Sequence, residues 1–263
     1  MKKEWIAAMA AVVLLVLAGG GMWWWYEGRT PPPAVPPVAT APPHAAPAQS
    51  EPSVRYPIEV PVAASAPLGI DAALAEVFGR KAVLRLFQLQ DFPRRFVATV
   101  DNLGRAQAPV RMWPLNPAGG RFGVDRREGG EQVAASNVAR YTPYVQLIES
   151  VDLQQAAMLY ARLYPQLQRA YEELGYPKQY FNDRLVEVID QLLATPEPGG
   201  PLKVHLPAIA APLKPERPWV LYEFDDPALQ SLTAGQRVLL RMGPANEKRV
   251  KARLIEFRRL VTS

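Results

Sequence analysis

Apolar side chains recur at helical spacing through the second half of the chain. The apolar positions of "FPRRFVATVDNLG" are Phe92, Phe96, Val100 and Leu103. Their separations of three or four residues predict one face of a helix. Arg94 and Asp101 fall almost opposite that face, which predicts that both are exposed.

A longer helix is predicted to begin at Asp152 and to stop at Gly175. Asp152 and Gln155 resemble a capping box at its start. Its apolar stripe consists of Leu153, Ala156, Ala157, Tyr160, Tyr164, Leu167, Tyr171 and Leu174. Pro165 lacks a backbone donor and predicts a kink. The three tyrosines could stack on sugar rings. Such positions are more typical of core tyrosines whose hydroxyl groups reach the solvent-exposed edge of the core.

Three further helices follow from the same kind of pattern. Residues 181–193 place Phe181, Leu185, Val188, Ile189, Leu192 and Leu193 on one face and Asp183, Glu187 and Asp190 on the other. Thr233 and Gln236 form a capping box for a helix that ends at Gly243. The last helix carries an apolar stripe of Val250, Leu254, Phe257 and Val261.

The remaining segments are shorter. Asp71 is predicted to cap a helix that runs to Gly79, and another covers about 81–89. The glycine pairs in 104–135 predict a hairpin or surface loop, and the alternation in 202–224 predicts a hairpin or two short strands. The expected fold is mainly α: a multi-helix single domain with a small β-hairpin element.

The N-terminus reads as a membrane anchor. No residue from Trp5 to Tyr26 is charged, and 22 helical residues span roughly 33 Å, enough for a bilayer core of about 30 Å. A cleaved signal peptide is the alternative, with small residues near Gly20 for the cut. The aromatic run 23–26 favours a permanent span, because such residues gather at the membrane interface. Lys2 and Lys3 predict a cytoplasmic N-terminus.

Residues 31–67 hold 12 prolines and nine alanines, which is typical of an extended spacer. A recognition site for a proline-binding module is the alternative. The predicted organisation is a cytoplasmic N-terminus at 1–4, a transmembrane anchor at 5–26, a disordered proline-rich spacer at 27–68 and a periplasmic helical domain at 69–263. This organisation predicts a protein that crosses the membrane once, which in a Gram-negative cell is the inner membrane.

Composition removes several kinds of chemistry. There is no cysteine, which excludes disulfides, thiolate nucleophiles and a lipoprotein anchor. The two histidines are His44, in the proline-rich stretch, and His205, so no histidine metal cluster can form. We therefore expect no cofactor and no metal. The net charge of +5 is suited to binding nucleic acid, but the predicted location contradicts that partner.

Four stretches of the sequence carry a resemblance to a known protein family. They are "VATVDNL", "RYTPYVQLIESVD", "AYEELGYPKQYFNDRLVEVIDQLLATP" and "GQRVLLRMG". Over about residues 70–261 the chain resembles the bacterial family named domain of unknown function 3014. Members similar to this chain also have an N-terminal membrane segment and a proline-rich spacer. The resemblance implies this topology and brings no activity, ligand or catalytic residue.

The predicted function is a membrane-tethered interaction or scaffolding module with a protein partner in the cell envelope; no oligomeric state follows. An alternative is an enzyme that acts on glycan or peptidoglycan through paired carboxylates, with Asp101, Asp152, Asp183 and Asp190 as candidates. The candidate binding residues are Arg94, Arg95, Asp101, Asn102, Arg140 and Tyr141. In the alternative interpretation these arginine, aspartate and tyrosine contacts organise the fold. The basic residues around the last helix could face solvent or lipid headgroups.

Overall fold

The computed structural model describes residues 54–61, 69–208 and 217–263. In these ranges the chain is mainly helical, with nine α-helices and a small antiparallel sheet of four strands, which confirms the predicted fold class at that level. The predicted span at 5–26 lies outside the described residues. Within the described ranges, no helix combines the length and apolar character needed to cross a bilayer.

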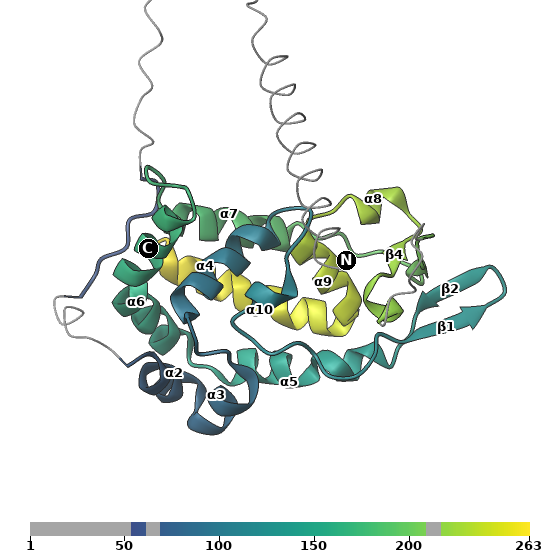
Figure 1. Ribbon diagram of the computed structural model, residues 1–263, viewed down its shortest axis with the longest axis horizontal. Coiled ribbons are helices and arrows are strands. Elements are labelled where there is room, and N and C mark those ends of the chain that lie inside the picture. Colours follow the sequence, from purple (N-terminus) through teal and green to yellow (C-terminus); the bar gives the residue numbers. More distant parts are fainter. Residues whose placement is uncertain (1–53, 62–68, 209–216) are drawn as a thin grey trace, which may run out of the picture. The chain divides into compact units, whose positions relative to one another are not determined.

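Figure 1 shows the order and arrangement of the elements. The α-helices are α2 (Ile70–Phe78), α3 (Arg80–Leu86), α4 (Phe92–Leu103), α5 (Asn137–Ser150), α6 (Leu153–Glu173), α7 (Phe181–Leu193), α8 (Pro227–Gln230), α9 (Ala234–Met242) and α10 (Pro244–Val261). Two single-turn 3-10 helices are η2 (Val110–Met112) and η3 (Pro218–Val220). The strands are β1 (Val124–Arg127), β2 (Gly130–Val133), β3 (Lys203–His205) and β4 (Glu223–Phe224).

The main hydrophobic core forms where α2, α3, α4, α6, α7 and the end of α10 meet. The predicted apolar faces of α4, α6 and α7 supply most of it, and the tyrosines of α6 are core residues. A second cluster joins the sheet to α9 through Val204, Phe224 and Leu240, and a third joins α5, α9 and α10. Helix packing therefore dominates the domain, and the sheet is a small addition at one side.

The sheet combines both segments that the sequence marked as strand-forming. Its order is β1-β2-β3-β4, with every neighbouring pair antiparallel. Gly129 in the β1–β2 turn and Gly130 at the start of β2 have φ values of 97° and 120°, conformations that glycine adopts without steric cost. His205 lies on the exposed side of β3, as predicted, with its Nδ1 2.7 Å from an oxygen of Asp225.

The structure corrects some local expectations. Gly69, not Asp71, precedes the first turn of α2, and Asp71 lies within that turn. Helix α3 spans Arg80–Leu86 and is shorter at its C-terminal end than the expected 81–89. Phe87 has an extended backbone and pairs with Leu115 in an isolated bridge, which ends the helix. Helix α5 was not predicted as a separate element. The capping box of Thr233 and Gln236 is present at the start of α9.

We predict that Thr233→Ala lowers the free energy of unfolding by about 1 kcal/mol, because the hydroxyl accepts the N–H of Gln236 at 3.3 Å. Thr233→Ser is the matched control and keeps most of the stability. Urea unfolding of both variants, followed by circular dichroism, measures the difference. Equal stability of the alanine and serine variants would show that the cap is not needed.

Candidate functional site

Residues 54–61, here called the attachment segment, lie along α7 although they belong to the range predicted as spacer. The Asp183 carboxylate accepts hydrogen bonds from the backbone N–H groups of Arg55 (3.1 and 3.2 Å) and Tyr56 (2.9 Å). The Tyr180 hydroxyl accepts the N–H of Ile58 at 2.8 Å. The folded unit thus includes residues that lie before position 69, where composition placed its start.

Asn182 is the polar centre of this attachment and is fully buried. Its Nδ2 donates to the carbonyl oxygens of Tyr56 (2.9 Å) and Val261 (2.7 Å), and its Oδ1 accepts the Tyr160 hydroxyl (3.0 Å). Its backbone N–H donates to the Tyr164 hydroxyl at 3.1 Å. Burial raises the pKa of both tyrosines well above the ordinary value, so both hydroxyls keep their protons.

A hollow of about 330 Å³ lies between the attachment segment and α7. Its lining consists of Arg55, Tyr56, Val186, Glu187, Asp190, Gln191 and Ala194. Both carboxylates in the wall are already paired: Glu187 with Arg184 (2.9 Å), and Asp190 with Arg258 (2.6 and 3.0 Å). Neither can act as an acid or base on a ligand without giving up an ion pair.

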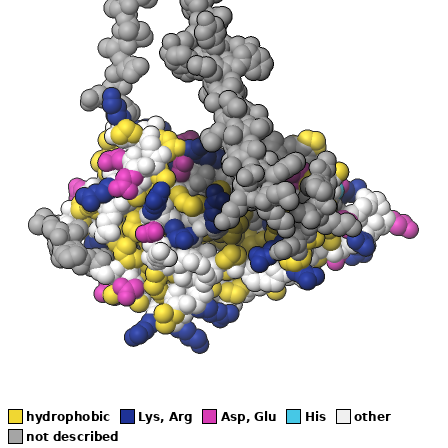
Figure 2. Space-filling view, in the orientation of Figure 1, with side chains coloured by type: hydrophobic (Ala, Val, Ile, Leu, Met, Phe, Trp, Pro, Cys, Tyr) yellow, Lys and Arg dark blue, Asp and Glu magenta, His cyan; other side chains and the backbone are white. Residues whose placement is uncertain are grey.

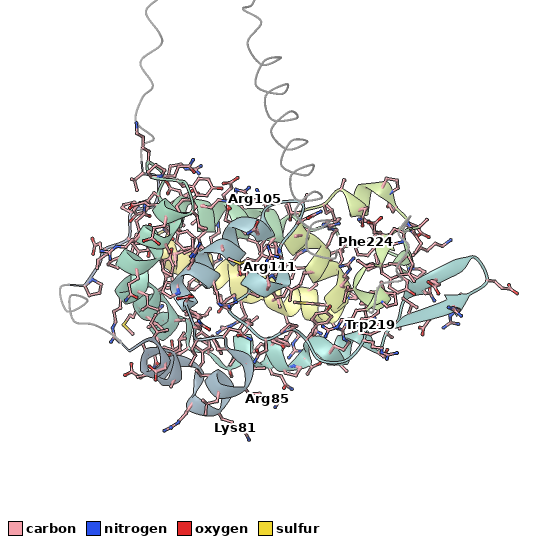
Figure 3. The ribbon with its side chains drawn as sticks, in the orientation of Figure 1. Lys81, Arg85, Arg105, Arg111, Trp219 and Phe224 are labelled. Carbon is pink, nitrogen blue, oxygen red and sulfur yellow. The ribbon has the colours of Figure 1, made fainter. Side chains whose placement is uncertain are left out.

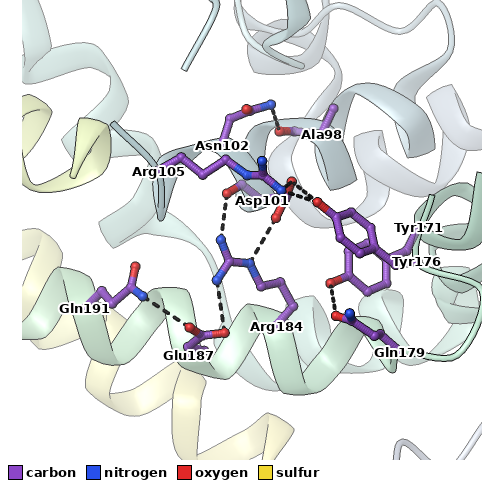
Figure 4. Close-up of polar contacts among 10 residues, drawn as sticks. All are labelled: Ala98, Asp101, Asn102, Arg105, Tyr171, Tyr176, Gln179, Arg184, Glu187 and Gln191. Carbon is purple, nitrogen blue, oxygen red and sulfur yellow. Dashed lines mark hydrogen bonds and ion pairs between the residues drawn. The ribbon is translucent and has the colours of Figure 1, made fainter. Parts of the chain in front are cut away.

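A second polar cluster joins the end of α4 to α7 and is shown in Figure 4. We call it the Asp101 cluster: Asp101, Arg105, Tyr176, Arg184 and Glu187. The Asp101 carboxylate is bound by Arg184 Nε (3.0 Å), by Arg105 (2.9 Å) and by the Tyr176 hydroxyl (3.2 Å). Arg184 also donates to the Asp101 carbonyl oxygen at 2.9 Å. The expectation that Asp101 is exposed is wrong, because side chains from α7 and from the turn after α6 cover it.

The charges of the Asp101 cluster balance. Two carboxylates face two guanidinium groups, so no net charge is left to attract a ligand. Burial lowers the pKa of Arg184, but its hydrogen bonds and charge pairs with Glu187 and Asp101 outweigh this and raise the pKa overall. Burial and the Asp101 charge raise the pKa of Tyr171, which stacks on Tyr176, to about 12. The arrangement is that of a clamp between helices.

The other predicted residues of α4 differ in their surroundings. Arg94 is exposed and has no ion pair within the part of the chain that the structure describes. Arg95 donates to backbone carbonyls, among them that of Arg111 at 2.6 Å, and so fixes η2 beside α4. Asn102 donates to the Ala98 carbonyl at 2.7 Å, within its own helix.

Arg140 and Tyr141 lie on α5 and support a loop. Arg140 donates to the Gly119 carbonyl (3.0 Å) and to Asn137 Oδ1 (3.3 Å), and its guanidinium carbon lies 5.5 Å from the centre of the Tyr141 ring. This distance is within the range of a cation–π contact. In the described ranges, no hydrogen bond or ion pair joins these two residues to the predicted residues of α4.

The carboxylates considered for catalysis all have structural partners. Asp101 and Asp190 are in ion pairs, and Asp183 holds the attachment segment. Asp152 caps α6 by accepting the N–H groups of Gln154 (2.8 Å) and Gln155 (3.1 Å). Within the described residues, no group of three or more histidine, aspartate and glutamate side chains is arranged to hold a metal ion.

The basic residues of α10 are also mostly paired. Arg249 bonds to Glu149, Arg258 to Asp190, and Lys251 to the buried Glu247 at 2.7 Å. The first two pairs tie α10 to α5 and α7, and the third lies within α10, so the helix does not present the open basic face that the sequence suggested.

The sequence analysis did not predict the attachment segment or the roles of Tyr180, Asn182 and Asp183, which bind it. The segment "VRYPIEVP" alternates large apolar side chains, Tyr56 and Ile58 among them, with charged or proline positions. That alternation is a strand-like signal within an otherwise alanine- and proline-rich stretch. Asn182 and Tyr180 gave no comparable signal, since a single amide or hydroxyl in a helix pattern has no distinctive spacing.

We predict that Asp183→Ala makes the backbone amides of Arg55 and Tyr56 exchange hydrogen faster, by about ten-fold or more, because they lose their acceptor. Asp226→Ala is the matched control, since Asp226 also accepts a backbone N–H, that of Ala228 at 2.8 Å. Hydrogen exchange followed by mass spectrometry of the peptide that contains 54–61 measures the effect. Unchanged exchange in the Asp183 variant would contradict this role.

Comparison with known proteins gives one match. The family described as "Protein of unknown function (DUF3014)" matches residues 92–258, well over half of the chain. The matched range begins with α4 and ends within α10, so it contains the Asp101 cluster and also Tyr180, Asn182 and Asp183, which bind the attachment segment. Among the curated proteins and the solved structures, none matches. The chain belongs to the DUF3014 family.

Proposed function

We propose that the chain is a membrane-tethered interaction or scaffolding module of the bacterial cell envelope. A single span at 5–26 holds it in the inner membrane, with the N-terminus in the cytoplasm and the domain in the periplasm. The uncharged stretch, its aromatic end and the preceding lysines support this topology. The working part is the domain, which meets a protein partner at a distance from the anchor.

The observation that carries the proposal is the docking of the attachment segment. Three successive backbone contacts, at Arg55, Tyr56 and Ile58, fix the chain to α7. A tether that ended in a loose segment would leave the orientation of the domain free. A tether that is bound along a helix gives the domain a defined point of attachment, which favours a module that presents one face to a partner.

The enzyme alternative has less support. Glycoside hydrolysis needs two carboxyl groups roughly 5–10 Å apart that face one cleft and can exchange protons or attack the sugar. Asp101, Asp183 and Asp190 bind arginines or backbone N–H groups, and Asp152 caps a helix. A catalytic role for any of them would require the loss of a contact that holds the domain together.

The first test concerns topology. A reporter enzyme that is active only in the periplasm, fused after Ser263, should be active, and the same reporter at the N-terminus should be inactive. The protein should stay in the membrane fraction after a high-salt wash, because a span does not depend on charge. A soluble product that begins near Gly21 would show a cleaved signal peptide and contradict the anchor.

The second test concerns reach. In polyproline II, the 23 residues 31–53 would extend roughly 70 Å, whereas a Gly/Ser chain of equal length has a root-mean-square span of about 24–29 Å. Replacement of 31–53 by Gly/Ser should therefore lower crosslinking to envelope proteins in intact cells. A shuffled 31–53 with the same prolines is the matched control and keeps the attachment segment intact. Equal crosslinking in both variants would mean that distance does not matter.

A further inference from the structure

The positive charge of this chain is concentrated in one region. Residues 80–111 contain seven arginines and lysines but only two acidic residues, Asp91 and Asp101. This excess equals the net charge of +5 of the entire chain, so the remainder is neutral in sum. The region covers α3, α4 and η2, which adjoin each other in the fold.

Three of these seven basic residues lie on helix α3 and are exposed. Arg80, Lys81, Leu84 and Arg85 are exposed, while Val83 and Leu86 are buried in the core. Neighbouring members of this set are one or three positions apart, and Arg80 and Lys81 lie four positions before Leu84 and Arg85, respectively, so the four share one side of the helix, which we call the α3 face. In the described ranges, none of its three cations has a carboxylate partner. Most basic residues of α10, by contrast, are paired with carboxylates.

An aliphatic side chain protrudes from the middle of this face. Leu84 is 71% exposed, the largest value among the exposed large hydrophobic residues of the described part. Figure 2 shows a hydrophobic group set between basic ones at the lower end of the molecule, where Figure 1 places α3. Among the exposed large hydrophobic residues of the described part, the most exposed one thus lies between unpaired cations, an arrangement that solubility alone does not favour.

The neighbouring η2 extends the surface. Asn116 N–H donates to the Leu86 carbonyl (2.8 Å), and Gln88 N–H donates to the Pro114 carbonyl (2.8 Å), so the chain after η2 packs beside the end of α3. Val110, 50% exposed, and Arg111 add a second apolar and basic pair. Figure 3 shows Lys81 and Arg85 at the lower edge and Arg111 above them, on the side toward the viewer.

We propose that the α3 face docks on an anionic lipid surface, with the arginines and the lysine at the headgroups and Leu84 inserted between them. Basic residues around a protruding aliphatic side chain are the combination by which peripheral segments bind anionic bilayers. A protein interface would require a broader apolar centre, and here the apolar surface is limited to Leu84 and Val110. Single-stranded nucleic acid would require stacking aromatic rings, which α3 lacks.

The inference rests on the proposed tethering, because a span would raise the concentration of the α3 face near a bilayer. The absence of cysteine makes a direct test possible. The full chain with Leu84→Cys carries a single fluorophore and is reconstituted into vesicles that contain a nitroxide-labelled lipid. One set is phosphatidylcholine alone, and in the other about a third of the lipid is phosphatidylglycerol.

We expect quenching at residue 84 to be about two-fold stronger with phosphatidylglycerol and to fall back in about 1 M salt, where the Debye length is about 3 Å. Met158→Cys is the matched control, because Met158 is 58% exposed on α6 and its neighbour Arg162 is paired with Glu76. A triple variant with Arg80→Glu, Lys81→Glu and Arg85→Glu should lose the lipid-dependent quenching. Arg80→Glu and Lys81→Glu lie in the first turn of α3, where acidic residues are favourable, whereas Arg85→Glu lies in its last turn, so circular dichroism of the variant checks that the fold is kept.

Three outcomes would overturn the proposal: equal quenching at residues 84 and 158, quenching that survives charge reversal, or no dependence on phosphatidylglycerol. Crosslinks from residue 84 to an acidic protein in cells, without quenching in the vesicles, would assign the face to a protein. A high-salt wash of the same vesicles tests the tethering separately. Retention of the chain after the wash, with no lipid-dependent quenching at low salt, would reject docking and keep the tether, while loss of the chain in the wash after lipid-dependent quenching at low salt would do the reverse.

Discussion

One buried amide holds the ends of this domain together. Asn182 at the start of α7 bonds to the attachment segment through Tyr56 and to the end of α10 through Val261. The hydroxyls of Tyr160 and Tyr164 from α6 complete its hydrogen bonds. Because an unpaired amide in an apolar core is strongly unfavourable, all four segments have to meet in one arrangement. The packing of α6 and α7, and with it the Asp101 cluster, depends on that junction.

The acidic side chains of α7 and the basic side chains of α3 differ in whether they have partners within the fold. The acidic side chains of α7 are all engaged: Asp183 by backbone N–H groups, Glu187 by Arg184 and Asp190 by Arg258. The cations of the α3 face have no such partners in the described ranges. The carboxylates therefore stabilise the domain internally, and the surplus basic residues remain for external contacts. This division adds support to the proposed role as an interaction module.

The sequence predicted the helices whose apolar residues repeat at a regular spacing, and it failed where context decides. The faces of α4, α6, α7 and α10 were readable because their burial follows the helical period. Helix α5 has no comparable stripe and contains Pro143, so its existence depends on packing against α9 and α10. Asp101 is buried by Arg184, which is 83 residues away in the sequence, and no local pattern carries that information. The attachment segment was hidden by the composition around it.

The closeness of the attachment segment to the C-terminal end of α10 has a mechanical consequence. Tension that arrives from the N-terminal side meets the hydrogen bonds of Arg55, Tyr56 and Ile58 before it reaches α2. The strain passes into α7 and, through Asn182, to the end of α10. Helices α2 and α3 are spared, so the α3 face keeps its shape while the domain is pulled. Under the proposed tethering, thermal motion of the membrane would move the domain as a rigid body rather than unravel it from its N-terminal end.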